Sequence, residues 1–168
     1  MTEEVSVSQD EIYMAAAIQE ARRAQILNEV PIGAVIVKDG EIIGKGFNLR
    51  ESMQTTLTHA ELIAIQEANQ AVGSWRLEDC TLYVTLEPCP MCAGALVQSR
   101  IKRVVYGASD SKAGCAGTLM NLLEEPRFNH QVEVTSGILE QQCSTILKNF
   151  FKALRQKKSG KGSTMEDT

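Results

Sequence analysis

Two short segments of the sequence carry side chains that can bind a metal ion. The first holds His59 and Glu61, and the second, Pro88-Cys-Pro-Met-Cys92, begins its cysteine pair 30 residues after the histidine. Zinc binds imidazole nitrogen and thiolate sulfur, and a catalytic zinc site keeps its fourth position for water. We therefore expect His59, Cys89 and Cys92 to form a zinc site with one open position.

A carboxylate stands close to the first predicted ligand. Glu61 is two residues beyond His59, and ideal helical spacing does not place both side chains on one face, so periodicity alone gives Glu61 no role. Zinc lowers the pKa of its water from 15.7 toward roughly 7. A neighbouring carboxylate can then take a proton from that water and pass it to a leaving amine. We expect Glu61 to be this proton carrier.

The Cys-x-x-Cys spacing also permits two other interpretations. A structural zinc site needs a fourth protein ligand, for which Cys80, Cys115 or His130 would have to be recruited. A redox dithiol would have no need of the histidine segment. The presence of both segments favours catalytic zinc. Cys80 and Cys143 are expected in the core, and His130, as a lone histidine, is expected to be structural.

The surrounding pattern predicts strands that alternate with helices. Both metal-binding segments precede a helix, whose positive end favours thiolate over thiol. A capping pattern, Ser8-Gln-Asp-Glu11, opens the first helix, and Asp39-Gly40 joins two strands in a hairpin. Later helices are predicted at 60–72, 93–98, 119–123 and around 143–154, and later strands at 81–86, 103–106 and 132–135. This order indicates an α/β domain with a mixed sheet and helices on both faces.

Length and composition predict one soluble domain. The 168 residues can bury a hydrophobic core, and 43% of them are hydrophobic and 23% charged, as in an ordinary globular protein. The sequence has neither the roughly 18-residue apolar run of a membrane span nor the pattern of a secretory signal. Five irregularly spaced cysteines make a poor disulfide framework and agree with a reducing compartment. We expect a cytoplasmic protein without a membrane partner.

Charge is divided unevenly along the chain. Residues 1–147 carry 11 basic and 19 acidic side chains, whereas residues 148–168 carry six basic and two acidic ones. The pI of about 5.3 argues against a general nucleic-acid coat protein. The basic end can be a solvated helix face or a local anchor for phosphates. Its Lys, Ser and Gly content predicts a disordered basic tail over residues 158–168.

The two metal-binding segments have a known counterpart. His-x-Glu followed by Pro-Cys-x-x-Cys resembles the signature of the zinc-dependent nucleoside and nucleobase deaminases. Within that superfamily, the run from Thr81 to Ala95 and the later Val-Val-Tyr-Gly-Ala-x-Asp110 are similar to the bacterial tRNA-specific adenosine deaminases. The likeness extends from about Ala15 to Phe151.

This resemblance implies a fold, a cofactor and a reaction. The fold would be a cytidine-deaminase-like, three-layer α/β/α sandwich with a five-stranded mixed sheet, in one zinc deaminase domain over residues 1–157. One Zn²⁺ per subunit would be held by His59, Cys89 and Cys92, with Glu61 as the proton shuttle. The reaction would be the hydrolytic deamination of the wobble adenosine to inosine in a tRNA anticodon loop, in an arginine tRNA. The enzyme would act as a homodimer, and no DNA partner is expected.

The same resemblance assigns substrate contacts. Asn48 matches an asparagine that hydrogen-bonds the base, and Asp110 and Lys112 match loop positions that contact the neighbouring nucleotides. Phe151, together with Phe150, matches an aromatic pair near the bound loop. An anticodon loop suits such a site because its bases are already unstacked. Residues 49–56 match no motif.

Two other functions are compatible with these motifs. A deaminase of a free base or nucleoside, of the guanine or cytosine type, would share the zinc site. A non-catalytic RNA-binding module could hold zinc structurally and would not need Glu61. The approach to Cys89, the loop at Asp110 and the basic end of the chain favour a tRNA substrate.

Overall fold

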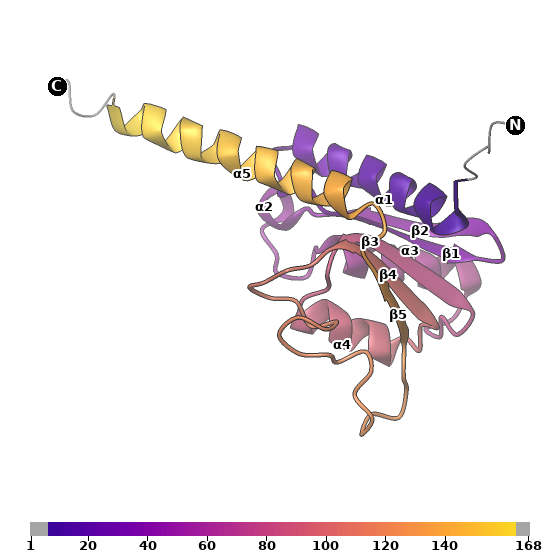
Figure 1. Cartoon of the computed structure of the whole chain (residues 1–168). Coiled ribbons are helices and arrows are strands. Elements are labelled where there is room, and N and C mark those ends of the chain that lie inside the picture. Colours follow the sequence, from indigo (N-terminus) through magenta and orange to yellow (C-terminus); the bar gives the residue numbers. More distant parts are fainter. Residues whose placement is uncertain (1–6, 164–168) are drawn as a thin grey trace, which may run out of the picture.

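A five-stranded sheet forms the centre of the molecule (Figure 1). The computed structural model describes residues 7–163, with side chains to residue 159. The elements are α1 (Gln9–Ile26), β1 (Gly33–Lys38), β2 (Glu41–Phe47), α2 (Arg50–Met53), α3 (Ala60–Val72), β3 (Cys80–Leu86), α4 (Pro90–Gln98), β4 (Arg103–Ala108), β5 (Glu133–Ser136) and α5 (Glu140–Ser163). The strand order is β2-β1-β3-β4-β5.

The strand directions make the sheet mixed, as predicted. β1 and β2 form the expected antiparallel hairpin, and its turn residues Asp39 and Gly40 both have positive φ, 50° and 76°, which suits an Asp-Gly turn. β1 also pairs antiparallel with β3, whereas β3–β4 and β4–β5 are parallel. Parallel neighbours need a crossover connection, and α4 supplies it between β3 and β4. The carboxyl ends of β3 and β4 therefore meet at one end of the sheet.

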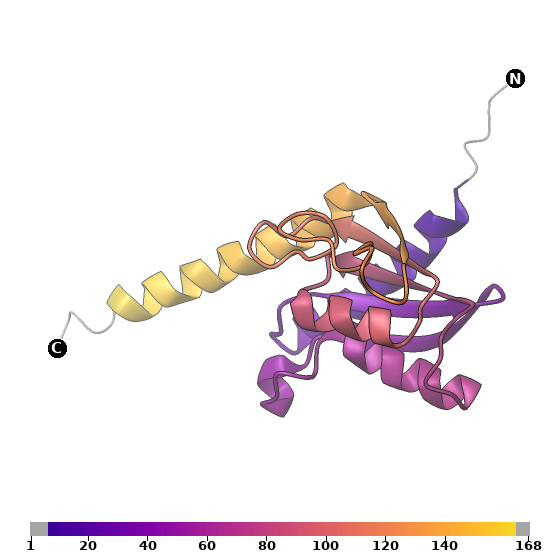
Figure 2. The ribbon, with the colours of Figure 1, turned by 90° about the horizontal axis from the view of Figure 1, so that it is seen from below.

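Helices cover both faces of the sheet, which confirms the predicted three layers. α3 and α4 lie together on one face, as Figure 2 shows, and α1 and α5 lie on the other. Successive residues of a strand point to opposite faces. Ile36 and Leu82 accordingly belong to the core under α3 and α4, and Val35 and Tyr83 belong to the core under α1 and α5.

The first helix begins where the capping pattern predicts. The side-chain oxygen of Ser8 accepts a hydrogen bond of 3.2 Å from the backbone N–H of Glu11. This bond satisfies one of the N–H groups that have no partner inside the helix. The apolar positions at helical spacing are all buried, namely Met14, Ala17, Ile18 and Ala21.

The last helix extends further than the sequence predicted. α5 continues to Ser163, so residues 158–163, which the sequence assigned to a disordered tail, belong to this helix in the structure; residues 164–168 lie outside the described part of the chain. The run from Lys152 to Lys158 consists largely of strong helix formers, which favours the continuation of α5 past Phe151. Every described side chain from Phe151 to Ser159 is exposed, and in Figure 1 this part of α5 projects past the rest of the molecule.

The long connection between β4 and β5 is also different from the prediction. Residues 119–123 form no helix; the segment contains turns and an isolated bridge between Ala116 and Asn121. Its backbone hydrogen bonds do not follow the helical pattern: Cys115 donates to the Pro88 carbonyl outside the segment, and within it Leu122 donates to the Cys115 carbonyl and Val132 to the Leu123 carbonyl. Leu123 is fully buried and anchors the segment to the core.

An ion-pair network fastens α1 to the sheet at the end away from the β3 and β4 carboxyl ends. Asp10 accepts hydrogen bonds from both terminal nitrogens of Arg103, at 2.9 and 2.7 Å, and from the hydroxyl of Tyr83 at 2.8 Å. Arg103 also donates to Thr135 on β5. The hydrogen bond from Arg103 holds the pKa of Asp10 below its ordinary value of 3.8, against the opposing effect of burial.

Within residues 7–163, no helix is both long and apolar enough to cross a bilayer.

Replacing Asp10 by Asn should lower the free energy of unfolding by about 1–3 kcal/mol, because a two-point charge-assisted pairing is lost. Urea unfolding at neutral pH measures the difference. The folded-state pKa is depressed, so this contribution is complete above pH 3.8 and disappears as the pH falls through the lower folded value. The control is Glu78→Gln, in a pair with Arg76 whose side chains are more than half exposed. It should change stability by less than about 1 kcal/mol; equal losses in both variants would contradict the role given to Asp10.

Candidate metal and substrate site

The three predicted ligands converge at the first turns of two helices. His59 is the N-cap residue of α3, Cys89 is the N-cap residue of α4, and Cys92 follows inside the first turn of α4. Pro90 occupies the start of α4, where its missing N–H costs no helical hydrogen bond. The Nδ1 atom of His59 lies 3.6 Å from the Cys89 sulfur and 3.5 Å from the Cys92 sulfur. Two segments far apart in the sequence thus form one cluster.

The cluster has the dimensions of a zinc site. Zinc–nitrogen bonds of about 2.0–2.1 Å and zinc–sulfur bonds of about 2.3 Å, at a tetrahedral angle, place nitrogen and sulfur about 3.6 Å apart. The observed distances of 3.5 and 3.6 Å match this separation. Within the part of the chain that the structure describes, His59, Cys89 and Cys92 are the complete group with metal-binding geometry. A structural zinc site would need a fourth protein ligand, which this group does not contain.

The electrostatics of the cluster favour a cation. A hydrogen bond with Cys92, assisted by His59, lowers the pKa of the Cys89 thiol to about 4, and the same contact raises the pKa of Cys92. The contact with Cys89 raises the pKa of His59. The cluster therefore concentrates negative charge on one sulfur. Cysteine and histidine bind metals in their deprotonated forms, so a bound divalent ion would displace the protons that these side chains share.

Glu61 lies in the first turn of α3, beside the cluster. Its side chain is only 4% exposed, and burial raises the pKa of its carboxyl to about 7. It lines the same cavity as His59 and Cys89. A buried carboxyl that faces a cavity next to a metal-binding cluster can hold a proton and release it to a group bound in that cavity.

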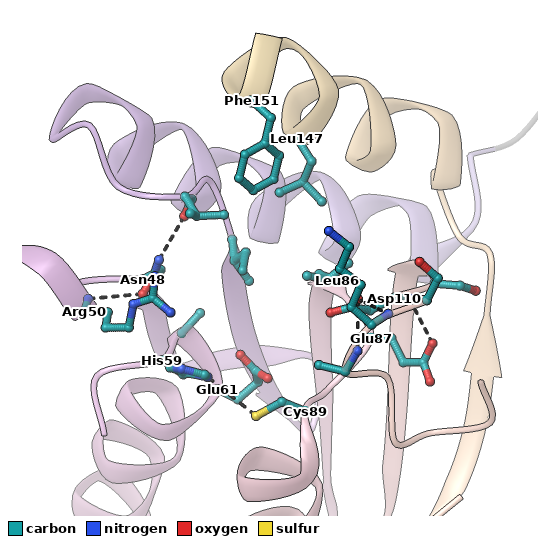
Figure 3. A pocket seen from close by; sticks show the side chains of 17 residues that line it. Asn48, Arg50, His59, Glu61, Leu86, Glu87, Cys89, Asp110, Leu147 and Phe151 are labelled. Carbon is teal, nitrogen blue, oxygen red and sulfur yellow. Dashed lines mark hydrogen bonds between the residues drawn. The ribbon is translucent and has the colours of Figure 1, made fainter. Parts of the chain in front are cut away.

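The cavity above the cluster has a volume of about 510 Å³ (Figure 3). His59, Glu61 and Cys89 lie at its base, and Phe151 and Leu147 of α5 point toward them from the opposite side. Its other walls come from the loop after β2 and the loop after β4. Most of the lining surface is apolar, and polar groups are concentrated near the base and along the rim, which is typical of a small-molecule binding site.

Asn48 is where the resemblance places it, at the end of β2 and in the cavity wall. The side chain is 7% exposed and already makes two hydrogen bonds: its amide nitrogen donates to the carbonyl of Val30, and its oxygen accepts from the N–H of Arg50. A side-chain amide has two N–H donors and two oxygen lone pairs, so each end retains capacity for a ligand.

Asp110 and Lys112 lie on the rim, in the loop after β4. One oxygen of the Asp110 carboxylate accepts hydrogen bonds from the N–H groups of Lys112 and Ala113, at 3.0 and 3.3 Å. The carboxylate therefore shapes its own loop. The Lys112 side chain is exposed at the cavity mouth.

Phe151 also lines the cavity and is 40% exposed. Its ring packs edge-on against the half-buried Phe150, with centroids 5.4 Å apart. An aromatic face at a cavity mouth can stack on a nucleobase.

The cavity-lining residues that sequence reasoning did not assign include Arg50, Leu147 and Glu87. Leu147 precedes Phe151 by four residues, so helical periodicity could have found it. Arg50 and Glu87 have no such signal, because their positions depend on how the loops fold.

Other predicted residues take no direct part. Cys80 and Cys143 are buried in the core, as expected. A ring nitrogen of His130 contacts the carbonyl of Ile101, and His130 does not line the cavity. Cys115, which had no predicted role, is also buried.

Comparison with known proteins identifies relatives along nearly the whole chain. The profile of the MafB19-like deaminases matches residues 8–155. The tRNA-specific adenosine deaminase of Bacillus subtilis (strain 168) is 60% identical over 152 residues, which cover 90% of this chain and 94% of the relative. The enzyme of the same name from Streptococcus pyogenes serotype M18 is 47% identical over 153 residues, 91% of this chain and 96% of the relative.

A solved structure gives the same result. It comes from studies of A-to-I editing by tRNA:A34 deaminases at the wobble position of transfer RNA, and it is 41% identical to this chain, with a TM-score of 0.78. The match covers 81% of this chain and 99% of the other. It confirms the predicted cytidine-deaminase-like fold. Fold, metal-binding cluster and sequence identity together show that the chain belongs to the MafB19-like deaminases and, among them, to the tRNA-specific adenosine deaminases.

Proposed function

We propose that this chain is a zinc-dependent enzyme that converts the wobble adenosine of a tRNA anticodon loop, in an arginine tRNA, to inosine. The observation that carries the proposal is the buried Glu61 carboxyl next to the His59, Cys89 and Cys92 cluster at the base of a cavity. The relatives named tRNA-specific adenosine deaminase support the choice of substrate. We propose that the enzyme acts as a cytoplasmic homodimer.

The chemistry requires a nucleophile and a proton carrier. When bound to His59, Cys89 and Cys92, zinc supplies the Lewis acidity that activates water near neutral pH. Glu61 takes one proton from the water that attacks C6 of adenine and delivers it to N1. It then takes the second proton from the new C6 hydroxyl and passes it to the amine, so that the C6–N bond breaks, ammonia leaves and the C6 carbonyl forms. Adenosine and water become inosine and ammonia, and Glu61 ends the cycle in its starting state.

The cavity selects and orients the base. A base must leave its stack to reach Glu61, and an anticodon loop lowers the cost of this step. Asn48 is positioned to hydrogen-bond the polar edge of the base, and Phe151 can stack on a base near the opening. Leu147 excludes water from the same side.

Cations around the opening can hold the RNA backbone. Arg50, at the start of α2, and Lys112, in the loop after β4, line the cavity from two different segments. Arg155 and Lys158 follow Phe151 by four and seven residues, so they continue the cavity-facing side of α5 along its exposed part. The rest of the chain is acidic overall, which confines phosphate attraction to this region.

The metal cluster can be tested by removing its ligands. Cys89→Ser and His59→Ala should reduce the zinc content from about one equivalent per chain to near zero, because a catalytic site has three protein ligands and none to spare. Elemental analysis of the purified variants measures this. Cys143→Ala is the control, since Cys143 is a buried cysteine on α5 outside the cluster. It should retain zinc; full retention in Cys89→Ser would exclude this ligand set.

The reaction is tested with an anticodon stem-loop that carries a wobble adenosine. The wild-type protein should produce inosine, detected by sequencing, and Glu61→Ala should reduce the rate at least about a hundredfold while it retains zinc and RNA binding, because only the proton carrier is removed. Turnover of a free base without conversion of the stem-loop would replace the proposed substrate. Undiminished turnover by the Glu61 variant would refute the role of this carboxyl.

The contribution of α5 can be isolated by two double variants with equal loss of charge. Arg155→Gln with Lys158→Gln removes cations on the Phe151 side of the helix, and Lys152→Gln with Lys157→Gln removes cations from other sides. The first pair should weaken RNA binding and reduce the slope of log affinity against log salt by about 1.4, since each phosphate contact contributes about 0.7. The second pair should leave the slope unchanged; equal slopes in both would attribute the effect to net charge alone.

A further inference from the structure

Glu87 is a buried carboxylate that no step of the proposed reaction uses. It directly follows β3, two residues before Cys89, and is 2% exposed. One of its oxygens accepts hydrogen bonds from the N–H of Asp110, at 3.1 Å, and from the hydroxyl of Thr118. The other accepts from the N–H groups of Ala116 and Thr118, at 3.0 and 3.1 Å.

All four partners of this carboxylate belong to the loop after β4, residues 109–118. In the part of the chain that the structure describes, Glu87 forms no ion pair with Lys, Arg or His, so N–H and O–H dipoles alone offset its buried charge. Buried charge is costly unless hydrogen bonds satisfy it, and four donors aimed at two oxygens do so. The contact is therefore specific for a carboxylate and for this loop conformation.

The loop lies directly against the segment that carries Glu87. The N–H of Cys115 donates to the carbonyl of Pro88, at 2.9 Å. A Cβ atom at Gly114 would lie 2.5 Å from the Glu87 carboxyl carbon and 2.5 Å from the carbonyl oxygen of Asp110. A side chain at position 114 would not fit, so glycine at this position allows the loop to pack against the carboxylate.

We propose that Glu87 is a positioning residue that holds the 109–118 loop against the metal-binding segment and thereby sets Asp110 and Lys112 at the rim of the cavity. The four hydrogen bonds set the position of the loop, because they hold its beginning at Asp110 and its end at Thr118. The consequence for RNA binding rests on the proposed function. The loop placement itself does not.

The variant Glu87→Gln tests this with little change in volume. An amide has one acceptor oxygen and one NH₂ donor, whereas all four partners of Glu87 can donate. Of these partners only the Thr118 hydroxyl can accept a hydrogen bond instead. The NH₂ group will therefore face Thr118 and Asp110, and it will leave the N–H of Asp110 without an acceptor. We expect the start of the loop to be released first.

A first measurement needs no substrate. Lys112 is exposed within the loop, so trypsin cleavage after it, followed by mass spectrometry of the native protein, measures how often the loop opens. Glu87→Gln should accelerate this cleavage about tenfold, which corresponds to the loss of one strong buried hydrogen bond.

The chain supplies a matched control. Glu29 is equally buried, and its carboxylate accepts hydrogen bonds from the N–H groups of Glu51 and Ser52 in the short helix α2. Glu29→Gln should leave cleavage after Lys112 unchanged and should accelerate cleavage after Arg50. Acceleration after Lys112 in both variants would mean general destabilisation and would overturn the proposal.

A second pair of variants keeps the test valid where the buried Glu87 variant does not fold. Thr118 is exposed, so Thr118→Val removes only the hydroxyl donor and Thr118→Ser retains it. Thr118→Val should accelerate cleavage after Lys112 by several-fold, and Thr118→Ser should behave as the wild type. An equal effect of both substitutions would assign the change to packing.

The link to substrate is measured by kinetics on the anticodon stem-loop. Glu87→Gln with full zinc content should raise KM about tenfold and change kcat less than twofold, since the rim contacts the RNA and the cluster performs the chemistry. Faster cleavage after Lys112 with an unchanged KM would disprove the role in RNA binding. If the wild type does not convert the stem-loop, the proposed function fails, and the proteolysis result still decides whether Glu87 holds the loop.

Discussion

Helix α3 lies so close to strand β2 that no side chain fits between them. A Cβ atom at Gly46 would lie 2.2 Å from the carbonyl oxygen of Ala60, and one at Gly44 would lie 2.4 Å from that of Ala64. Two glycines that face small residues permit this approach. Because His59 caps the same helix, its imidazole is carried to within 3.6 Å of both sulfurs on α4. A helix held further from the sheet by one methyl group would separate the ligands by more than zinc–ligand bonds can span.

The walls of the cavity depend on hydrogen bonds to buried carboxyl groups, because close packing of helices and strands does not position these connecting segments. Glu29 lies two residues before Pro31, and Glu87 directly precedes Pro88. Each accepts hydrogen bonds from backbone N–H groups of a segment that borders the cavity. Carboxylates accept several donors at once and lose much when one is missing. The regular core therefore positions the His59, Cys89 and Cys92 cluster, and the buried side chains of Glu29 and Glu87 hold the segments around it.

Local patterns in the sequence were sufficient for features that depend on neighbouring residues. The Ser8 cap, the Asp39-Gly40 turn and the ligand types at His59, Cys89 and Cys92 are of this kind. The segment at 119–123 was assigned to a helix wrongly, because its backbone groups pair with residues 114–117 of the same connection in turns and a bridge instead of with one another in a helical pattern. The roles of Arg50 and Glu87 were missed because their positions depend on contacts with residues distant in the sequence. The Ser and Gly residues beyond residue 157 have low helix propensity, so their composition does not predict that α5 continues to Ser163.

The cluster at the floor of the cavity and the cations on α5 differ in the size of substrate that they can contact. Attack on a purine would involve only the residues at the floor of the cavity. A free nucleobase would fit within the cavity volume of about 510 Å³. α5 nevertheless continues from Phe151, at the opening, to Ser163, and it carries its cations where the surrounding protein offers no contact. A free base bound near Glu61 cannot reach Arg155 or Lys158. A polynucleotide with its target nucleotide in the cavity extends beyond the opening, where the cations of α5 are within its reach if its backbone follows this helix. The chemistry at the cluster is thus independent of substrate size, whereas the cations on α5 contribute only when the substrate extends beyond the cavity.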